Sequence, residues 1–268
     1  MKKLLFIIVT LISANCSFAQ KESVDSLLNL MRSAKEDTGK VLLYIDIGNQ
    51  YELNDINEAG HYYLLAGELS KKLNYKRGLI KFIANYTAVL NTRGEYDSSI
   101  NLNKEAIRLS KEINDEMLLA KATANTGNCF NLLGQYDSAA YYYETAKNYF
   151  EKILDGYLVA RMNDLIQIMY WNMYQYEKGI AVGKYAVQYF RQNKKEMELG
   201  QALINLANNY QSNLNREDAV VCYKEGLSIG RKTGYKMLEL TCLLGIGNIY
   251  FHLFETDSMQ VYYTKALV

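Results

Sequence analysis

The chain contains no proline, although it is 268 residues long. Proline interrupts helices because its ring removes a backbone hydrogen bond and clashes with the preceding turn. Its absence therefore favours long, uninterrupted helices. No stretch alternates apolar and polar residues over enough positions to predict a strand. We therefore predict an all-α fold.

Histidine is scarce, with only His61 and His252 present, far apart in the sequence. The chain has no HExxH, P-loop or GxSxG motif and no Cys–His pairing. Neighbouring acidic residues such as Glu217 and Asp218 fall where helices are expected to begin, and there they complement the helix dipole. We therefore expect a non-catalytic protein with no cofactor and no metal site.

Neither sign of charge dominates, because 30 basic residues face 29 acidic ones. This balance lacks the basic surface expected of a protein that binds nucleic acid or anionic lipid. Beyond the first residues, no apolar run is long enough to span a bilayer. We expect neither a nucleic-acid partner nor a membrane span within this chain.

The N-terminus has the pattern of a secretory signal peptide. Lys2 and Lys3 precede the apolar run 4–12, and small residues at Ser17 and Ala19 suit a signal peptidase. We predict a signal peptide over 1–19, cleaved after Ala19, and an exported protein, periplasmic or secreted. Lipidation at Cys16 is disfavoured because asparagine precedes it where a small residue is needed.

Three cysteines remain after this segment: Cys129, Cys222 and Cys242. Their spacing fits no zinc or CxxC pattern. An oxidising compartment would permit one disulfide, between Cys222 and Cys242 on neighbouring predicted helices. The preferred interpretation is that all three cysteines are small buried residues.

A period of about 40 residues runs through the chain, and a fixed period of this size is typical of a solenoid of stacked units. A solenoid presents an extended binding surface. The positions separated by whole multiples of the period are Gly127, Ala207 and Gly247; Phe130, Tyr170, Tyr210 and Tyr250; Tyr143, Tyr223 and Tyr263; and Ala106, Ala146, Ala186, Gly226 and Ala266.

The unit around Gly127 shows how the period works. Gly127 lies on a first helix, a turn follows at Gly134, and a second helix carries Ala139, Tyr143 and Ala146. The last three share one helical face. Small residues allow the two helices to approach closely, and the tyrosine fills the remaining space. Glycine at the turn supplies a conformation that other residues resist.

These residues resemble the tetratricopeptide repeat, which has the patterns Leu-Gly-x-x-Tyr and Ala-x-x-x-Phe/Tyr-x-x-Ala. The resemblance implies an α-α superhelix, a right-handed TPR solenoid of antiparallel helix pairs. The usual unit has about 34 residues, so the longer unit here implies helices of about 16–18 residues. The run 24–28 (VDSLL), followed by Asp37-Thr38 and Lys40-Val41, resembles the start of periplasmic repeat regions of Bacteroidetes-type sensor histidine kinases and regulators, and this resemblance covers the first 50 residues best.

We predict a capping helix over 20–36 and a solenoid over 37–268. The apolar stripe of the cap comprises Val24, Leu27, Leu28, Leu30 and Met31. The six predicted units are 37–75, 76–115, 116–155, 156–195, 196–235 and 236–268, with the last one truncated. Leu253, Tyr263 and Leu267 of the last unit would lack a covering neighbour, so we expect the chain to continue past Val268, or a partner or second copy to cover that face.

In tetratricopeptide arrays the first helix of each unit lines the concave groove. Positions 2, 6 and 9 of that helix share one face, with Gly127 taken as position 8. The candidate binding residues on that face are Lys81, Asn85, Lys121, Asn125, Asn128, Arg161, Asn205, Asn208 and Asn248, with Trp171 one turn further on.

An asparagine amide donates and accepts, so a row of them can hold the backbone of an extended peptide. The basic residues would add charge-assisted bonds to a carboxylate or an acidic side chain. Trp171 would form an apolar pocket for an anchor residue, together with Leu165 and Ile168. The set resembles in part the lysine–asparagine clamp for a C-terminal carboxylate, but Ala84 stands where a further basic residue is expected.

The alternative is that these asparagines are solvated polar positions without a binding role. The 24 tyrosines are expected to pack the second helices rather than to form a stacking platform. The leading functional prediction is a scaffold that binds a protein or peptide segment. The alternative is the periplasmic sensory region of a membrane-anchored signal-transduction protein, such as a histidine kinase. A third possibility is that the groove binds a second copy of the chain.

Overall fold

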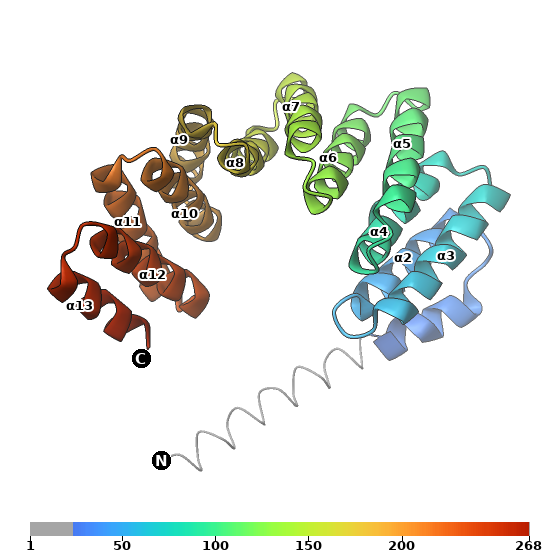
Figure 1. Ribbon diagram of the computed structural model, residues 1–268. Helices are drawn as coiled ribbons and strands as arrows, with labels where there is room; N and C mark the ends of the chain where they lie inside the picture. Colours follow the sequence, from blue (N-terminus) through green and yellow to red (C-terminus); the bar gives the residue numbers. More distant parts are fainter. Residues whose placement is uncertain (1–23, 268) are drawn as a thin grey trace, which may run out of the picture. The chain divides into compact units, whose positions relative to one another are not determined.

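The computed structural model describes residues 24–267, so the predicted signal peptide lies outside the described residues. Within this range the chain is helical and contains no strand. Consecutive helices run antiparallel and are joined by short turns (Figure 1). A first helix over 24–33 is followed by α2 (Thr38–Tyr51), α3 (Ile56–Lys72), α4 (Lys76–Thr92), α5 (Tyr96–Glu112), α6 (Glu116–Leu132), α7 (Tyr136–Lys152), α8 (Gly156–Asn172), α9 (Tyr176–Gln192), α10 (Glu196–Ser212), α11 (Arg216–Thr233), α12 (Lys236–His252) and α13 (Thr256–Ala266).

Helix length follows the prediction from the repeat period. The helices α3 to α10 and α12 have 17 residues each, and α11 has 18. Several helices begin at an aspartate whose carboxylate accepts hydrogen bonds from the first free backbone N–H groups. Asp37, Asp55 and Asp155 cap α2, α3 and α8 in this way.

Each of the helices α3 to α12 is followed by a turn that contains one residue in the left-handed conformation. At Gly134 the backbone N–H bonds to Asn131 O at 2.9 Å, and the next N–H bonds to Phe130 O at 2.9 Å, which is the Schellman arrangement. The predicted turn glycine is therefore confirmed. The turn at Gly134 joins the two helices of one pair. The equivalent turns in the next three pairs, after α8, α10 and α12, place Tyr174, Leu214 and Phe254 at positive φ instead. This conformation costs a residue with a side chain about 1–2 kcal/mol.

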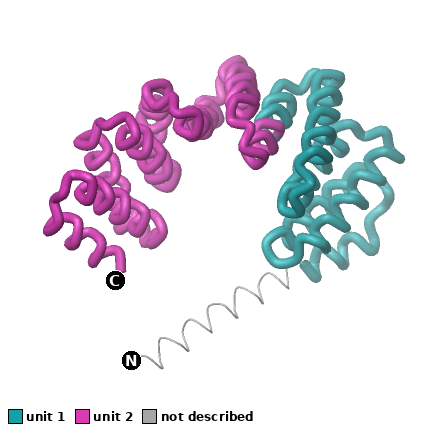
Figure 2. The backbone as a smooth tube through the Cα atoms, viewed as in Figure 1, with its two compact units in different colours: residues 1–125 teal, residues 126–268 magenta. Residues whose placement is uncertain are grey.

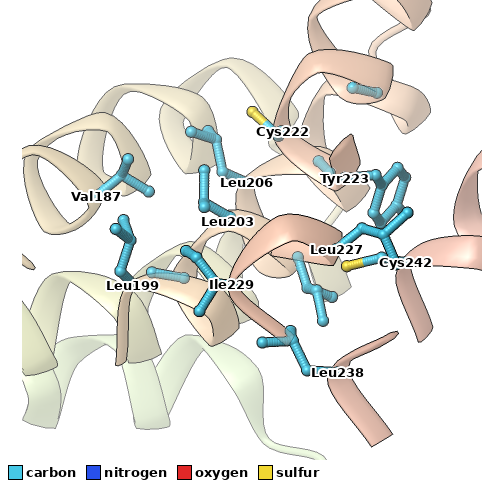
Figure 3. Close-up of a cluster of buried hydrophobic side chains, with 14 of the residues drawn as sticks. Val187, Leu199, Leu203, Leu206, Cys222, Tyr223, Leu227, Ile229, Leu238 and Cys242 are labelled. Atoms are coloured by element: carbon cyan, nitrogen blue, oxygen red, sulfur yellow. The ribbon is translucent and has the colours of Figure 1, made fainter. Parts of the chain in front are cut away.

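The described chain divides into two compact units, one ending at Asn125 and the other beginning at Thr126 (Figure 2). Each unit has its own apolar core. In the first unit the largest fully buried side chain is that of Tyr63. In the second unit, Leu203, Tyr223 and Cys242 belong to one cluster of side chains from successive helices (Figure 3).

The cysteines and the N-terminal helix show two outcomes of the sequence analysis. Cys129, Cys222 and Cys242 are buried free thiols, as the preferred interpretation of the sequence predicted. Burial raises the pKa of Cys222 to about 11 and that of Cys242 to about 12, so neither is a reactive thiolate at neutral pH. Leu30 was expected in the apolar stripe of the N-terminal helix, but its side chain is 57 % exposed, so the stripe is narrower than predicted.

Candidate functional site

The helices form pairs, in which α2, α4, α6, α8, α10 and α12 come first. The second helices α3, α7, α11 and α13 each carry a tyrosine whose hydroxyl donates to an asparagine on the first helix of the same pair. The asparagine Oδ1 accepts in every case, and the hydroxyl–oxygen distances are 2.8 Å for Tyr63–Asn49, 2.7 Å for Tyr143–Asn128, 2.6 Å for Tyr223–Asn208 and 2.6 Å for Tyr263–Asn248. Burial raises the pKa of the first three hydroxyls, which keeps them protonated donors.

This pairing changes what the predicted asparagines can do. In Asn128, Asn208 and Asn248 the amide oxygen already accepts from tyrosine. The side-chain N–H groups remain as donors to a ligand, and the tyrosine bond uses one of the two lone pairs of the oxygen. The sequence pattern identified the recurring tyrosines and the recurring asparagines but did not predict the hydrogen bonds between them.

Asn205 is not on an open surface. Its side chain is 8 % exposed, and its amide nitrogen donates to Asp164 Oδ1 at 3.0 Å. Gln167 donates to the same oxygen at 2.6 Å. Asn205 is thus part of a buried polar cluster between α8 and α10, and we leave it out of the binding surface proposed below.

Burial raises the pKa of the Asp164 carboxyl above its ordinary value, and this outweighs the hydrogen bonds from Asn205 and Gln167 and the charge of Arg161, all of which lower it. A carboxyl with a raised pKa binds a proton more tightly in the folded than in the unfolded protein. The folded state therefore loses stability as pH rises from the unfolded pKa, near 3.9 for aspartate, towards the folded pKa.

Asp164→Asn should accordingly raise the free energy of unfolding at pH 7, and the gain should vanish below about pH 4. Each tenfold difference in proton affinity between folded and unfolded states corresponds to about 1.4 kcal/mol. Urea unfolding of both proteins from pH 3 to pH 8 measures the effect. Asp46→Asn, at an exposed position, controls for loss of one negative charge. A gain that is independent of pH would contradict the assignment.

In the first unit, four predicted residues line one cavity of about 210 Å³ between α4, α5 and α6. They are Lys81, Asn85, Lys121 and Asn125, and the second-helix residue Asn103 completes the polar lining. We call this cavity the Asn103 pocket. Both lysines are exposed, Asn85 and Asn125 are half-buried, and Asn103 is buried. The structure thus brings together the two lysine–asparagine pairs that the helical register placed on one face.

The Asn103 pocket exists where the repeat pattern is broken. Asn103 takes the place that Tyr143 holds one repeat later, and Ala88 likewise takes the place of Asn128. Where this repeat position holds a tyrosine, the tyrosine ring packs beside the first helix of the pair, as Tyr143 does beside Gly127. Asn103 has a shorter side chain than tyrosine and is one of the residues that line the cavity. The sequence analysis did not single out Asn103, although the gap in the tyrosine column was the available signal.

The two remaining candidates lie on α8 in the second unit. Arg161 is exposed. The indole N–H of Trp171 donates to Ser212 Oγ at 2.9 Å, and its side chain is 39 % exposed. Trp171 therefore connects the ends of two first helices, α8 and α10.

Comparison with known proteins bears on the fold. No family model and no curated protein matches the sequence. A Signal Transduction ATPase with Numerous Domains (STAND) protein with a tetratricopeptide repeat sensor, from Pyrococcus horikoshii, is 17 % identical with a TM-score of 0.81. That match covers 92 % of this chain and 39 % of the STAND protein, so the chain spans well under half of that protein.

Two further solved structures are similar. TPR-like repeats of a putative kinesin light chain from Podosopora anserina are 14 % identical, with a TM-score of 0.63 and coverage of 74 % of this chain and 99 % of that one. A Rap protein complexed with competence and sporulation factor is 14 % identical, with a TM-score of 0.66 and coverage of 96 % and 71 %. The chain has the tetratricopeptide-repeat fold. At these identities the likeness shows the fold alone.

The tetratricopeptide fold here holds no cluster typical of metal binding, since residues 24–267 contain no group of three His, Cys, Asp or Glu able to hold an ion. Both histidines are exposed, and each ring contacts a neighbouring aromatic ring, Tyr62 for His61 and Phe251 for His252. Among the described helices, none has the length and apolar character needed to cross a membrane.

Proposed function

We propose that this tetratricopeptide protein is a non-catalytic scaffold that binds an extended segment of another protein along its first helices. The observation that carries the proposal is the Asn103 pocket, where successive first helices α4 and α6 contribute matching lysine–asparagine pairs. In the second unit, considered by itself, the side-chain N–H groups of Asn128, Asn208 and Asn248 could likewise donate to a peptide backbone. The Rap structure in complex with competence and sporulation factor shows a ligand held by a protein of this fold.

The second candidate is a sensory region of a membrane-anchored signal-transduction protein, exported to the periplasm. The STAND protein favours it, since its tetratricopeptide repeats are described as a sensor within a longer signalling chain. Both candidates use the same binding surface and differ in what the bound segment triggers.

The scaffold proposal is tested by selecting peptides from a displayed library of random sequences on residues 20–268, then measuring affinities by isothermal titration. Lys121→Ala with Asn125→Ala should weaken the selected peptides at least tenfold, because a charge-assisted bond and a neutral one are lost. The matched control is Lys104→Ala with Asn101→Ala, at exposed positions of the second helix α5, and should change affinity less than twofold. Recovery of no peptide, or an equal loss in both variants, would refute the proposal.

A further inference from the structure

The Asn103 pocket has a lining with charge of one sign. It contains two lysines and no aspartate or glutamate. On the same helix α4, Lys76 pairs with Glu112 at 2.9 Å and Arg77 pairs with Asp115 at 2.5 Å. Lys81 and Lys121 enter no ion pair within residues 24–267. Two uncompensated positive charges therefore flank a hollow that carries no acidic group.

The size of the hollow suits a side chain better than a whole small-molecule ligand. Its volume is about 210 Å³, whereas pockets for small-molecule ligands commonly measure about 300–1,000 Å³. Its apolar wall would contact the methylene groups of an entering chain, while the polar groups hold the tip. That wall is formed by Ile80, Ala84, Ala106, Leu118 and Ala122.

We propose that the Asn103 pocket is a specificity pocket for an acidic side chain, glutamate above all, of the bound segment. The lysine ammonium groups at Lys81 and Lys121 supply charge-assisted hydrogen bonds to the carboxylate. Both lysines line the pocket and are exposed, so their charged ends can stay in water until the ligand arrives. This inference rests on the proposed scaffold function and names the chemistry that the scaffold selects.

The two asparagines Asn85 and Asn103 add polar but uncharged groups to the pocket. Asn85 Nδ2 already donates to Lys81 O at 2.8 Å, so the positive character at the mouth comes from the lysines. Asn103 is 1 % exposed and stands on α5, where tyrosine fills the equivalent space of other units. A ligand chain entering the pocket would thus meet the shorter asparagine at a position where tyrosine stands in the following helix pair.

The test uses synthetic peptides from the library selection, acetylated and amidated so that no terminal charge remains. Changing the anchoring glutamate to glutamine should weaken binding to the wild-type protein at least tenfold. The same change should have less than a twofold effect on the Lys81→Gln, Lys121→Gln double variant. Lys104→Gln is the matched control on α5 and should retain the full preference for glutamate.

A second variant fills the pocket without removing its charges. Thr87→Gly, Ala88→Asn and Asn103→Tyr together install the residues found at Gly127, Asn128 and Tyr143, so the first-unit packing should resemble that of the following pair. This variant should lose the glutamate preference while its thermal unfolding remains cooperative. A variant that fails to fold leaves the lysine variants to decide the question.

Three outcomes would overturn the inference. Peptides that bind equally well with glutamate or glutamine would rule out a pocket for an acidic side chain but leave the scaffold proposal intact. Dependence on a free C-terminus rather than on an internal glutamate would assign the carboxylate to the chain end. Failure to select any peptide would remove the scaffold proposal and this inference together.

Discussion

Tyr143→Ala should lower the free energy of unfolding by about 3–5 kcal/mol, whereas Tyr143→Phe should lower it by only about 1 kcal/mol. The Tyr143 side chain is fully buried. A Cβ atom at Gly127 would lie only 2.8 Å from its ring, so the ring packs directly on the first helix. Alanine would leave a cavity there, while phenylalanine keeps the ring and loses only the 2.7 Å hydrogen bond to Asn128.

Chemical unfolding followed by circular dichroism measures both changes. Tyr141→Ala is the matched control, because that tyrosine is on the same helix with its side chain 65 % exposed, and substitutions at such positions usually change stability by less than about 0.5 kcal/mol. If Tyr143→Phe proved as costly as Tyr143→Ala, the hydrogen bond to Asn128 rather than the buried ring would hold the helix pair together.

The fold was predictable because the repeat period and the spacing of small and aromatic residues constrain helix length and helix faces. The tyrosine columns followed from the same pattern. The hydroxyl partners did not, since periodicity gives the face on which a residue lies but not the atom that it contacts. Asn208 and Asn205 shared one predicted face, yet one accepts from Tyr223 and the other is buried against Asp164.

The unusual features lie where the columns change residue. Asn103 stands where tyrosine recurs in other repeats, and it lines a cavity. Tyr174 and Leu214 take turn positions that glycine occupies at Gly134, and a preference for glycine could not predict them. Of the predicted site residues, the lysine–asparagine pairs on α4 and α6 line one cavity in the first unit.

The fourth helix pair exchanges the large and small residues of the column. Gln167 takes the place of Gly127, and Gly183 takes the place of Tyr143. Gln167 is fully buried, and a Cβ atom at Gly183 would lie 2.0 Å from its Oε1. The helices α8 and α9 thus keep close contact with the bulk supplied from the opposite side.

Gly183→Tyr should therefore destabilise the protein by about 3 kcal/mol, since the ring and the Gln167 side chain would compete for one space. Gln167→Gly alone should also destabilise, because it opens a cavity and places glycine within a helix. Together the two changes restore the arrangement of the third pair, so their combined cost should be smaller than the sum of the single costs by about 1–3 kcal/mol.

A double-mutant cycle from urea unfolding measures this coupling. Gln188→Gly, at an exposed position of α9, brings the same glycine cost to a helix and should combine additively with Gly183→Tyr. Additive costs for Gln167→Gly and Gly183→Tyr would mean that the two side chains do not share one space. A favourable coupling would show that each helix pair requires one large and one small residue at this contact, whichever helix carries them. The pair of α4 and α5, with Asn103 in place of tyrosine, would then stand out as the pair that has no large residue at this contact.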